Sequence, residues 1–133
     1  MKYTTGHKHQ LVEDISCSTD IHPFMPIDHT YIHITIGGTL TVKKGYAWDG
    51  ASGCCPDNKY TLTPSLFHDA LYQLMRLMKL SESCRKPADL LFYKQLRERK
   101  LNWLIAKFCY RAIRRFGASS TDPRNKREVL EVR

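Results

Sequence analysis

Five polar residues in the middle of the chain have the types that hydrolytic chemistry needs. They are one imidazole, three carboxylates and one hydroxyl, namely Asp49, Ser52, His68, Asp69 and Asp89. Imidazole suits zinc, iron or nickel, and carboxylates suit manganese or magnesium, so Asp49, His68, Asp69 and Asp89 form a candidate set of ligands for a divalent metal ion. Such a metal would bind a phosphoryl oxygen or activate a water for attack. Without a metal, His68 oriented by Asp69 or Asp89 is a candidate general base.

A purely structural interpretation of the same residues stays open. His68 and Asp89 would then only hydrogen-bond each other across two helices. Asp49 would fix its own loop by accepting backbone N–H bonds. Sequence spacing alone does not choose between a catalytic and a structural role.

The stretch 63–80 predicts the helix that must position His68. Thr63 is a suitable cap, and Pro64 suits the first helical position. Apolar residues then recur at spacings of three and four, which predicts one buried stripe: Leu66, Phe67, Ala70, Leu71, Leu74, Met75 and Met78.

His68 and Asp69 lie at the flank of this stripe, because successive helical residues are about 100° apart. Tyr72 follows His68 by one turn, and Arg76 continues the Asp69 side. We expect Ser52 and Tyr72 to orient a substrate. Arg76, or Arg85 at the start of the next helix, would meet phosphate charge.

A hairpin is predicted before this helix. Residues 31–36 and 39–44 alternate between apolar and polar types around Gly37-Gly38, which is a strong hairpin signal. The loop 45–56 follows, with small residues that allow close backbone approach. It carries Trp48, which we expect in the core.

Two more helices are predicted after residue 80. One runs from about 85 to 99 and the other from about 101 to 116, where Gly117 is placed to end it. We expect Trp103, Leu104, Phe108 and Ala112 to form the buried side of the latter. These elements predict an α+β fold, a small antiparallel sheet packed by about three helices. Residues 1–117 would form one domain, and 118–133 a polar, loosely structured tail.

Basic residues gather on the last two predicted helices, with Trp103, Phe108 and Tyr110 between them. They are Arg97, Arg99, Lys100, Lys107, Arg111, Arg114 and Arg115, and Glu98 is the one acid among them. This pattern fits a surface that follows nucleic-acid phosphates. It fits equally a solvated outer face above an apolar inner face, which we favour.

Composition limits the class of protein. The chain has 133 residues and a formal net charge of +8, which favours an acidic partner such as a nucleotide or a nucleic acid. Five cysteines without a CxxC pair, and no apolar leader, favour a reducing cytoplasm. No apolar run is long enough to cross a bilayer.

Four motifs, in this order, resemble a family called domain of unknown function 1353, found mostly in tailed phages and prophages. They are residues 45–52 (GYAWDGAS), 68–72 (HDALY), Arg85 with 88–89 (AD), and 115–117 (RFG). The resemblance covers about residues 40 to 117. It implies that Asp49, Ser52, His68, Asp69 and Asp89 belong to one site, in a protein of the infected host cytoplasm or the virion. Many members carry Ile-Pro where this chain has Gly53-Cys54.

The run 66–69 (LFHD) also resembles the metal-binding dyad of HD-type phosphohydrolases. That family uses a further upstream histidine, whose place Asp49 would have to take. Together these features predict a small phage-encoded metal-dependent hydrolase of a phosphoester or nucleotide. The alternatives are a cell-wall amidase or peptidase serving lysis, and a non-enzymatic accessory protein that binds a host or virion partner.

Overall fold

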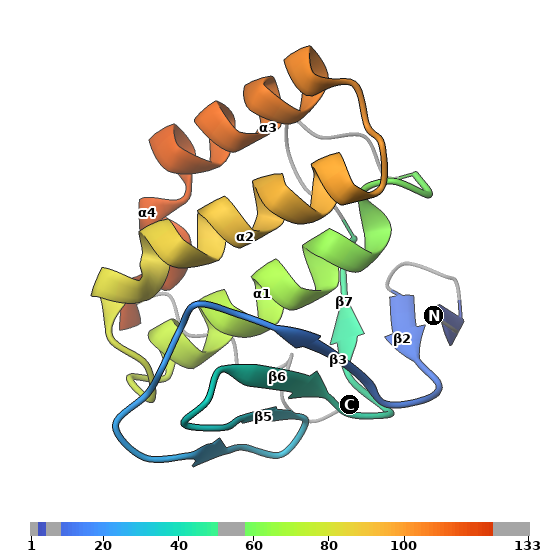
Figure 1. Ribbon diagram of the computed structural model, residues 1–133. Helices are drawn as coiled ribbons and strands as arrows, with labels where there is room; N and C mark the ends of the chain where they lie inside the picture. Colours follow the sequence, from blue (N-terminus) through green and yellow to red (C-terminus); the bar gives the residue numbers. More distant parts are fainter. Residues whose placement is uncertain (1–2, 5–8, 51–57, 124–133) are drawn as a thin grey trace. The chain divides into compact units, whose positions relative to one another are not determined.

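The computed structural model describes residues 3–4, 9–50 and 58–123. The fold is α+β, as predicted, with two small antiparallel sheets and four α-helices in these residues. The chain forms two compact units that meet in sequence at Asp49 and Gly50. The strands belong to the first unit and the helices to the second (Figure 1).

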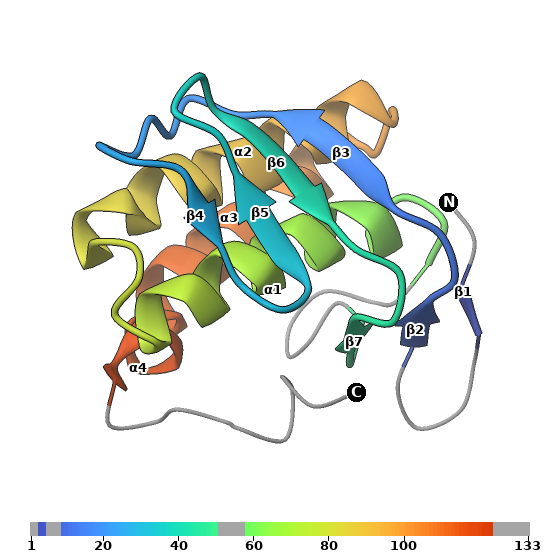
Figure 2. The same ribbon diagram turned by 90° about the horizontal axis from the view of Figure 1, so that it is seen from below.

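The first unit contains both sheets. One has the strand order β1-β2-β7, formed by Tyr3–Thr4, His9–Leu11 and Ala47–Trp48. The other, seen face-on in Figure 2, has the order β3-β6-β5-β4, formed by Ile15–Ser18, Thr39–Val42, Ile32–Ile34 and Ile27–Asp28. Trp48 is fully buried, as expected for a core residue.

The predicted hairpin is confirmed as β5 and β6. Ile32 pairs with Val42 and Ile34 with Leu40, and all four side chains are buried. Gly38 turns the chain with a φ of 94°, a conformation that glycine adopts without strain. The alternation of residues 31–36 places Ile36 on the same face as Ile32 and Ile34, but Ile36 lies beyond the end of β5 and is exposed.

The second unit consists of helices. They are α1 (Leu62–Arg76), α2 (Arg85–Glu98), α3 (Trp103–Phe116) and the short α4 (Ala118–Thr121), with a 3-10 turn at Glu82–Cys84. Figure 1 shows α2 between α1 and α3, and α1 also contacts α4. None of the described helices combines the length and apolarity required to span a membrane.

The apolar stripe predicted for α1 is buried from Leu66 to Met75. The helix begins at Leu62 and its N-cap residue is Thr61, so the predicted cap Thr63 is wrong, and Thr63 and Pro64 both lie inside the first turn. Met78 was expected in the stripe, but it lies past the helix end with a φ of 60° and is exposed. At Met78 the chain no longer follows the helix, so this side chain does not continue the buried face of α1.

The predicted buried side of α3 is wrong in three of its four residues. Trp103, Leu104 and Phe108 are exposed, and only Ala112 is buried. The buried side is formed by the small residues Ala106, Cys109 and Ala112. Cys109 and Ala106 join Phe92, Leu96 and Leu101 in one apolar cluster. Ala106 and Ala112 let two helix backbones approach closely, which favours their inward orientation. Cys109 is disulfide-bonded, a pairing that the prediction of a reducing compartment did not include.

The predicted tail begins as α4 and continues through Asp122 and Pro123. Residues 124–133 lie outside the described part of the chain.

Candidate functional site

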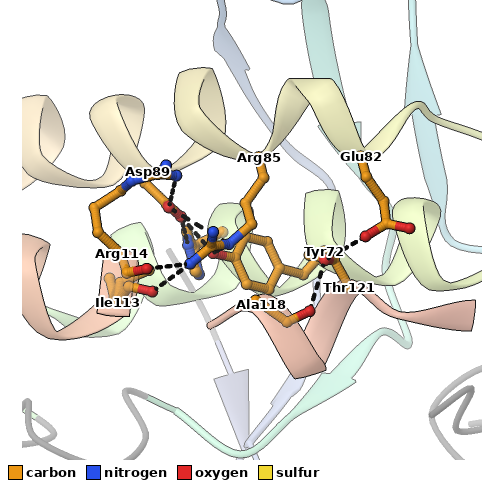
Figure 3. Close-up of polar contacts among 9 residues, drawn as sticks. Tyr72, Glu82, Arg85, Asp89, Ile113, Arg114, Ala118 and Thr121 are labelled. Atoms are coloured by element: carbon orange, nitrogen blue, oxygen red, sulfur yellow. Dashed lines mark hydrogen bonds and ion pairs between the residues drawn. The ribbon is translucent and has the colours of Figure 1, made fainter. Parts of the chain in front are cut away.

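Asp89, on the first turns of α2, is the centre of a buried polar cluster. Its side chain is completely inaccessible to solvent. Oδ1 accepts hydrogen bonds from His68 Nε2 at 2.7 Å and from the Tyr72 hydroxyl at 2.5 Å, both on α1. Oδ2 accepts one from Arg114 Nη1 on α3 at 2.8 Å. Figure 3 shows this convergence: one carboxylate connects three helices.

Arg85 makes hydrogen bonds both to this cluster and to the end of α3. Its Nε donates to the Tyr72 hydroxyl at 3.3 Å and lies 4.0 Å from Asp89 Oδ2. Its Nη2 donates to the carbonyls of Ile113 and Arg114, at 2.9 and 2.6 Å. These carbonyls belong to the last turn of α3, where a helix offers C=O groups to side-chain donors; the Ile113 carbonyl also accepts the backbone N–H of Gly117, at 2.8 Å. Arg85 therefore caps α3 through a charged side chain.

The electrostatics of the cluster favour an ionised Asp89. Burial alone raises the pKa of its carboxyl, but the hydrogen bonds from His68, Tyr72 and Arg114 outweigh burial and hold the pKa below its ordinary value. Burial and the neighbouring Asp89 raise the pKa of the Tyr72 phenol. Tyr72 is thus a neutral donor and Asp89 a charged acceptor near neutral pH.

The ionised carboxylate fixes the tautomer of His68. An ionised carboxylate only accepts hydrogen bonds, so His68 Nε2 must carry the proton that points at Asp89. In the neutral ring, Nδ1 then holds the lone pair. Among the described residues, no hydrogen bond reaches Nδ1, and the His68 side chain is 14% exposed. The ring packs on Tyr72 and Phe92, with centroids 4.1 and 5.2 Å away.

The structure brings His68, Tyr72, Arg85 and Asp89 together, four of the eight residues expected at the site. In the described chain, the contact between His68 and Asp89 predicted by the structural interpretation is present.

The other four expected residues do not take part in the hydrogen bonds described above, or lie outside the described residues. Asp49 is exposed and follows β7 in the first unit. Ser52 lies outside the described residues. Asp69 is half-buried on α1. Arg76 is buried and donates from Nη1 to the Ser120 carbonyl at 2.7 Å, so it ties α1 to α4. The predicted convergence of Asp49 with Asp89 remains a prediction.

Arg114 was not singled out from the sequence, where it was one of several basic residues on the same helix. It is half-buried, with a side chain 32% exposed, and donates to the central carboxylate. The nearest sequence signal is the RFG motif that follows it. Gly117 in that motif lies close to the Ile113 carbonyl, the Tyr72 hydroxyl and the Arg85 guanidinium.

Gly117 has an ordinary φ of −81°, so space rather than backbone conformation requires glycine here. A Cβ at this position would lie 2.6 Å from the Ile113 carbonyl oxygen, 2.7 Å from the Tyr72 hydroxyl and 3.3 Å from Arg85 Nη2. The first two contacts are too short to exist without movement of α3 or of Tyr72.

Gly117→Ala should therefore lower the free energy of unfolding by about 1–3 kcal/mol, the usual cost of overpacking. Denaturant unfolding followed by circular dichroism measures this. Gly37→Ala is a matched control, because its Cβ would meet only Thr35 Oγ1, at 3.8 Å. Equal stabilities of the two variants would show that a Cβ at position 117 is accommodated beside Tyr72 without cost, and would contradict the prediction.

No protein-family model, curated protein or solved structure matches this chain. The resemblance described above accordingly rests on its four motifs alone. Among the described residues there is no group of three or more histidine, cysteine, aspartate or glutamate side chains placed to hold a metal ion.

Proposed function

We propose that the protein is a small hydrolase in which His68 acts as the general base, with a phosphoester as its substrate class. The observation that carries this proposal is the fixed orientation of His68. A fully buried, ionised Asp89 holds Nε2–H, and the basic Nδ1 remains for another partner. A carboxylate that fixes the tautomer and orientation of an imidazole is the arrangement that general bases use.

In the proposed reaction, His68 Nδ1 takes a proton from a water molecule as the water oxygen forms a bond to phosphorus. The bond from phosphorus to the leaving oxygen breaks, and that oxygen leaves with the electron pair and is protonated by solvent. The imidazolium formed on His68 is stabilised by the adjacent Asp89 charge. Tyr72, by binding the same oxygen of Asp89, helps to keep this carboxylate in place.

An anionic substrate is supported by the charges around the site. The chain carries a formal net charge of +8, which attracts anions. Arg114 uses Nη1 on Asp89 and remains partly exposed, so its other nitrogens are candidate donors for a phosphoryl oxygen. Arg85 and Arg76 were expected in this role, but the structure binds both to backbone carbonyls.

A metal-dependent form of the same proposal would use the same ring nitrogen. Histidines that bind metals commonly donate their other N–H to a carboxylate, and His68 does so to Asp89. In that form, Asp89 would orient the ligand instead of binding the ion, since both of its oxygens already accept hydrogen bonds. Asp69 and Asp49 stay the other expected ligands.

Hydrolysis assays on the purified chain test the proposal. We expect turnover of at least one of 4-nitrophenyl phosphate, bis(4-nitrophenyl) phosphate and the common nucleotides, and its persistence in EDTA. Loss of turnover in EDTA and its return with Mn²⁺ would select the metal-dependent form. Turnover of cell-wall material alone would favour the lysis alternative. Folded protein without any turnover would favour the non-enzymatic interpretation.

A further inference from the structure

The outer face of α3 exposes large apolar side chains among cations. Trp103, Leu104 and Phe108 are 52%, 60% and 60% exposed. Lys107, Arg111 and Arg115 are exposed beside them on the same helix. We define these six residues as the α3 outer face. At about 100° per residue they share the side opposite Ala106, Cys109 and Ala112.

The apolar residues of this face are not needed for the core. The inner side of α3 packs with small residues, and its contacts with α2 are made by the cluster around Phe92 and Leu96. Three large apolar side chains within two helical turns, left in solvent, form a contiguous patch of the kind that marks an interaction surface.

The charge of the face indicates the sign of its partner. From Arg99 to Gly117 the chain has six lysines and arginines and no acidic residue: Arg99, Lys100, Lys107, Arg111, Arg114 and Arg115. Four of these cations lie within α3 itself. Arg114 among them is paired with Asp89, so Lys107, Arg111 and Arg115 are the cations that α3 offers to a partner. This charge favours an anionic partner that also accepts apolar side chains.

We infer that the α3 outer face binds the surface of an anionic lipid bilayer, with α3 lying parallel to the membrane plane. Trp103, Leu104 and Phe108 would enter the boundary between headgroups and acyl chains, and Lys107, Arg111 and Arg115 would meet lipid phosphates. This binding is peripheral and independent of the proposed hydrolase activity.

Leu104 favours lipid over single-stranded nucleic acid as the partner. Nucleic-acid surfaces combine cations with aromatic rings on which bases stack, and Trp103 and Phe108 would serve that purpose. The exposed aliphatic side chain between them has no role in stacking, whereas an acyl-chain boundary accepts all three residues equally. A lipid surface therefore explains the exposure of all three apolar residues, whereas base stacking explains only the two aromatic ones.

Trp103 provides a direct measurement. The other tryptophan, Trp48, is fully buried, so a change in emission on adding vesicles reports on Trp103. We expect a blue shift with phosphatidylcholine–phosphatidylglycerol vesicles at low salt, co-sedimentation with them, and neither effect with phosphatidylcholine alone. Trp103→Phe should abolish the shift and keep the co-sedimentation.

Matched variants test the two components of the face. Arg111→Glu should weaken binding by roughly 25-fold, because each unit of charge near an anionic bilayer is worth about 5-fold. Phe108→Ser should also weaken it. The controls Lys44→Glu and Phe24→Ser make the same kinds of change at exposed residues of the first unit, Phe24 being 96% exposed, and should bind as the parent does.

Three results would overturn the inference. They are equal binding to neutral and anionic vesicles, unchanged binding by Arg111→Glu and Phe108→Ser, and no binding by folded parent protein at low salt. Tight binding of a single-stranded oligonucleotide with quenching of Trp103, in the absence of vesicle binding, would instead assign the face to nucleic acid. Thermal melts of every variant confirm that each is folded.

Discussion

Replacing His68 with glutamine should slow phosphoester hydrolysis by about 100- to 10,000-fold, the range over which a positioned general base contributes. Glutamine can still donate from its amide nitrogen to Asp89, so the buried carboxylate keeps a partner. It has no basic nitrogen to take a proton from water. The rate constant should therefore fall far more than the stability, and turnover and denaturant unfolding are measured on the same preparation.

His33→Gln is the matched control. His33 also pairs with an aspartate, since its Nδ1 lies 3.4 Å from Asp28 Oδ1, but it belongs to β5 of the first unit. The control should hydrolyse substrate at the parental rate. Parental turnover by a folded His68→Gln protein would remove His68 from the reaction and leave the cluster a structural one.

The sequence predicts a part of the fold well where its hydrophobic pattern allows only one buried face. Strict alternation on both sides of Gly37-Gly38 leaves a hairpin as the only register that buries Ile32, Ile34, Leu40 and Val42 together. Apolar spacings of three and four fix the buried face of α1 in the same way. The contact of His68 with Asp89 was one of the two interpretations that the sequence left open, because spacing along the chain does not fix how two neighbouring helices pack.

The rotation of α3 about its own axis follows the distribution of its charges, which the choice of the large apolar residues as the buried side overlooked. At about 100° per residue, Lys107, Arg111, Arg114 and Arg115 lie within one sector of the helix, so α3 is strongly amphipathic. The small residues lie on the side opposite this sector, and the large residues Trp103, Leu104 and Phe108 lie within it or at its borders. Ala106, Cys109 and Ala112 allow α3 to approach α2, and Trp103 and Phe108 are turned outward.

The same rotation explains why Arg114 was missed. In the sequence Arg111, Arg114 and Arg115 look alike, and only the orientation of α3 turns one of them toward Asp89. A local pattern cannot encode this choice, because it depends on the packing of another helix. The expected roles of Asp49 and Ser52 depend similarly on the loop after β7, and they remain predictions.

Replacing Asp89 with alanine should reduce the free energy of unfolding by about 3–5 kcal/mol, the usual cost of removing one partner of a buried ion pair. The variant leaves Arg114, His68 and Tyr72 with donors that pointed at the lost carboxylate. It also removes an acceptor to which α1 and α3 both donate. Denaturant unfolding of parent and variant measures the difference.

Asp28→Ala is the control that isolates burial. Asp28 also has a cationic and a histidine partner, Lys43 Nζ at 3.2 Å and His33 Nδ1 at 3.4 Å, but it is exposed. Exposed ion pairs contribute little, because water screens them. The control should unfold together with the parent, within experimental error. A similar loss in both variants would mean that the burial of Asp89 adds nothing.

The pH dependence separates the charge of Asp89 from its packing. Its pKa is lower in the folded chain than its ordinary value, so the unfolded chain binds a proton more readily. The stabilisation from its charge is therefore fully present above the unfolded pKa, about 3.9, and is lost as the pH falls through the folded pKa. The parent should lose stability on acidification more steeply than Asp89→Ala, and the two curves should converge at low pH. Parallel curves would show that the cost of the substitution comes from lost packing, and the carboxylate would then lose its place as the charged centre of the site.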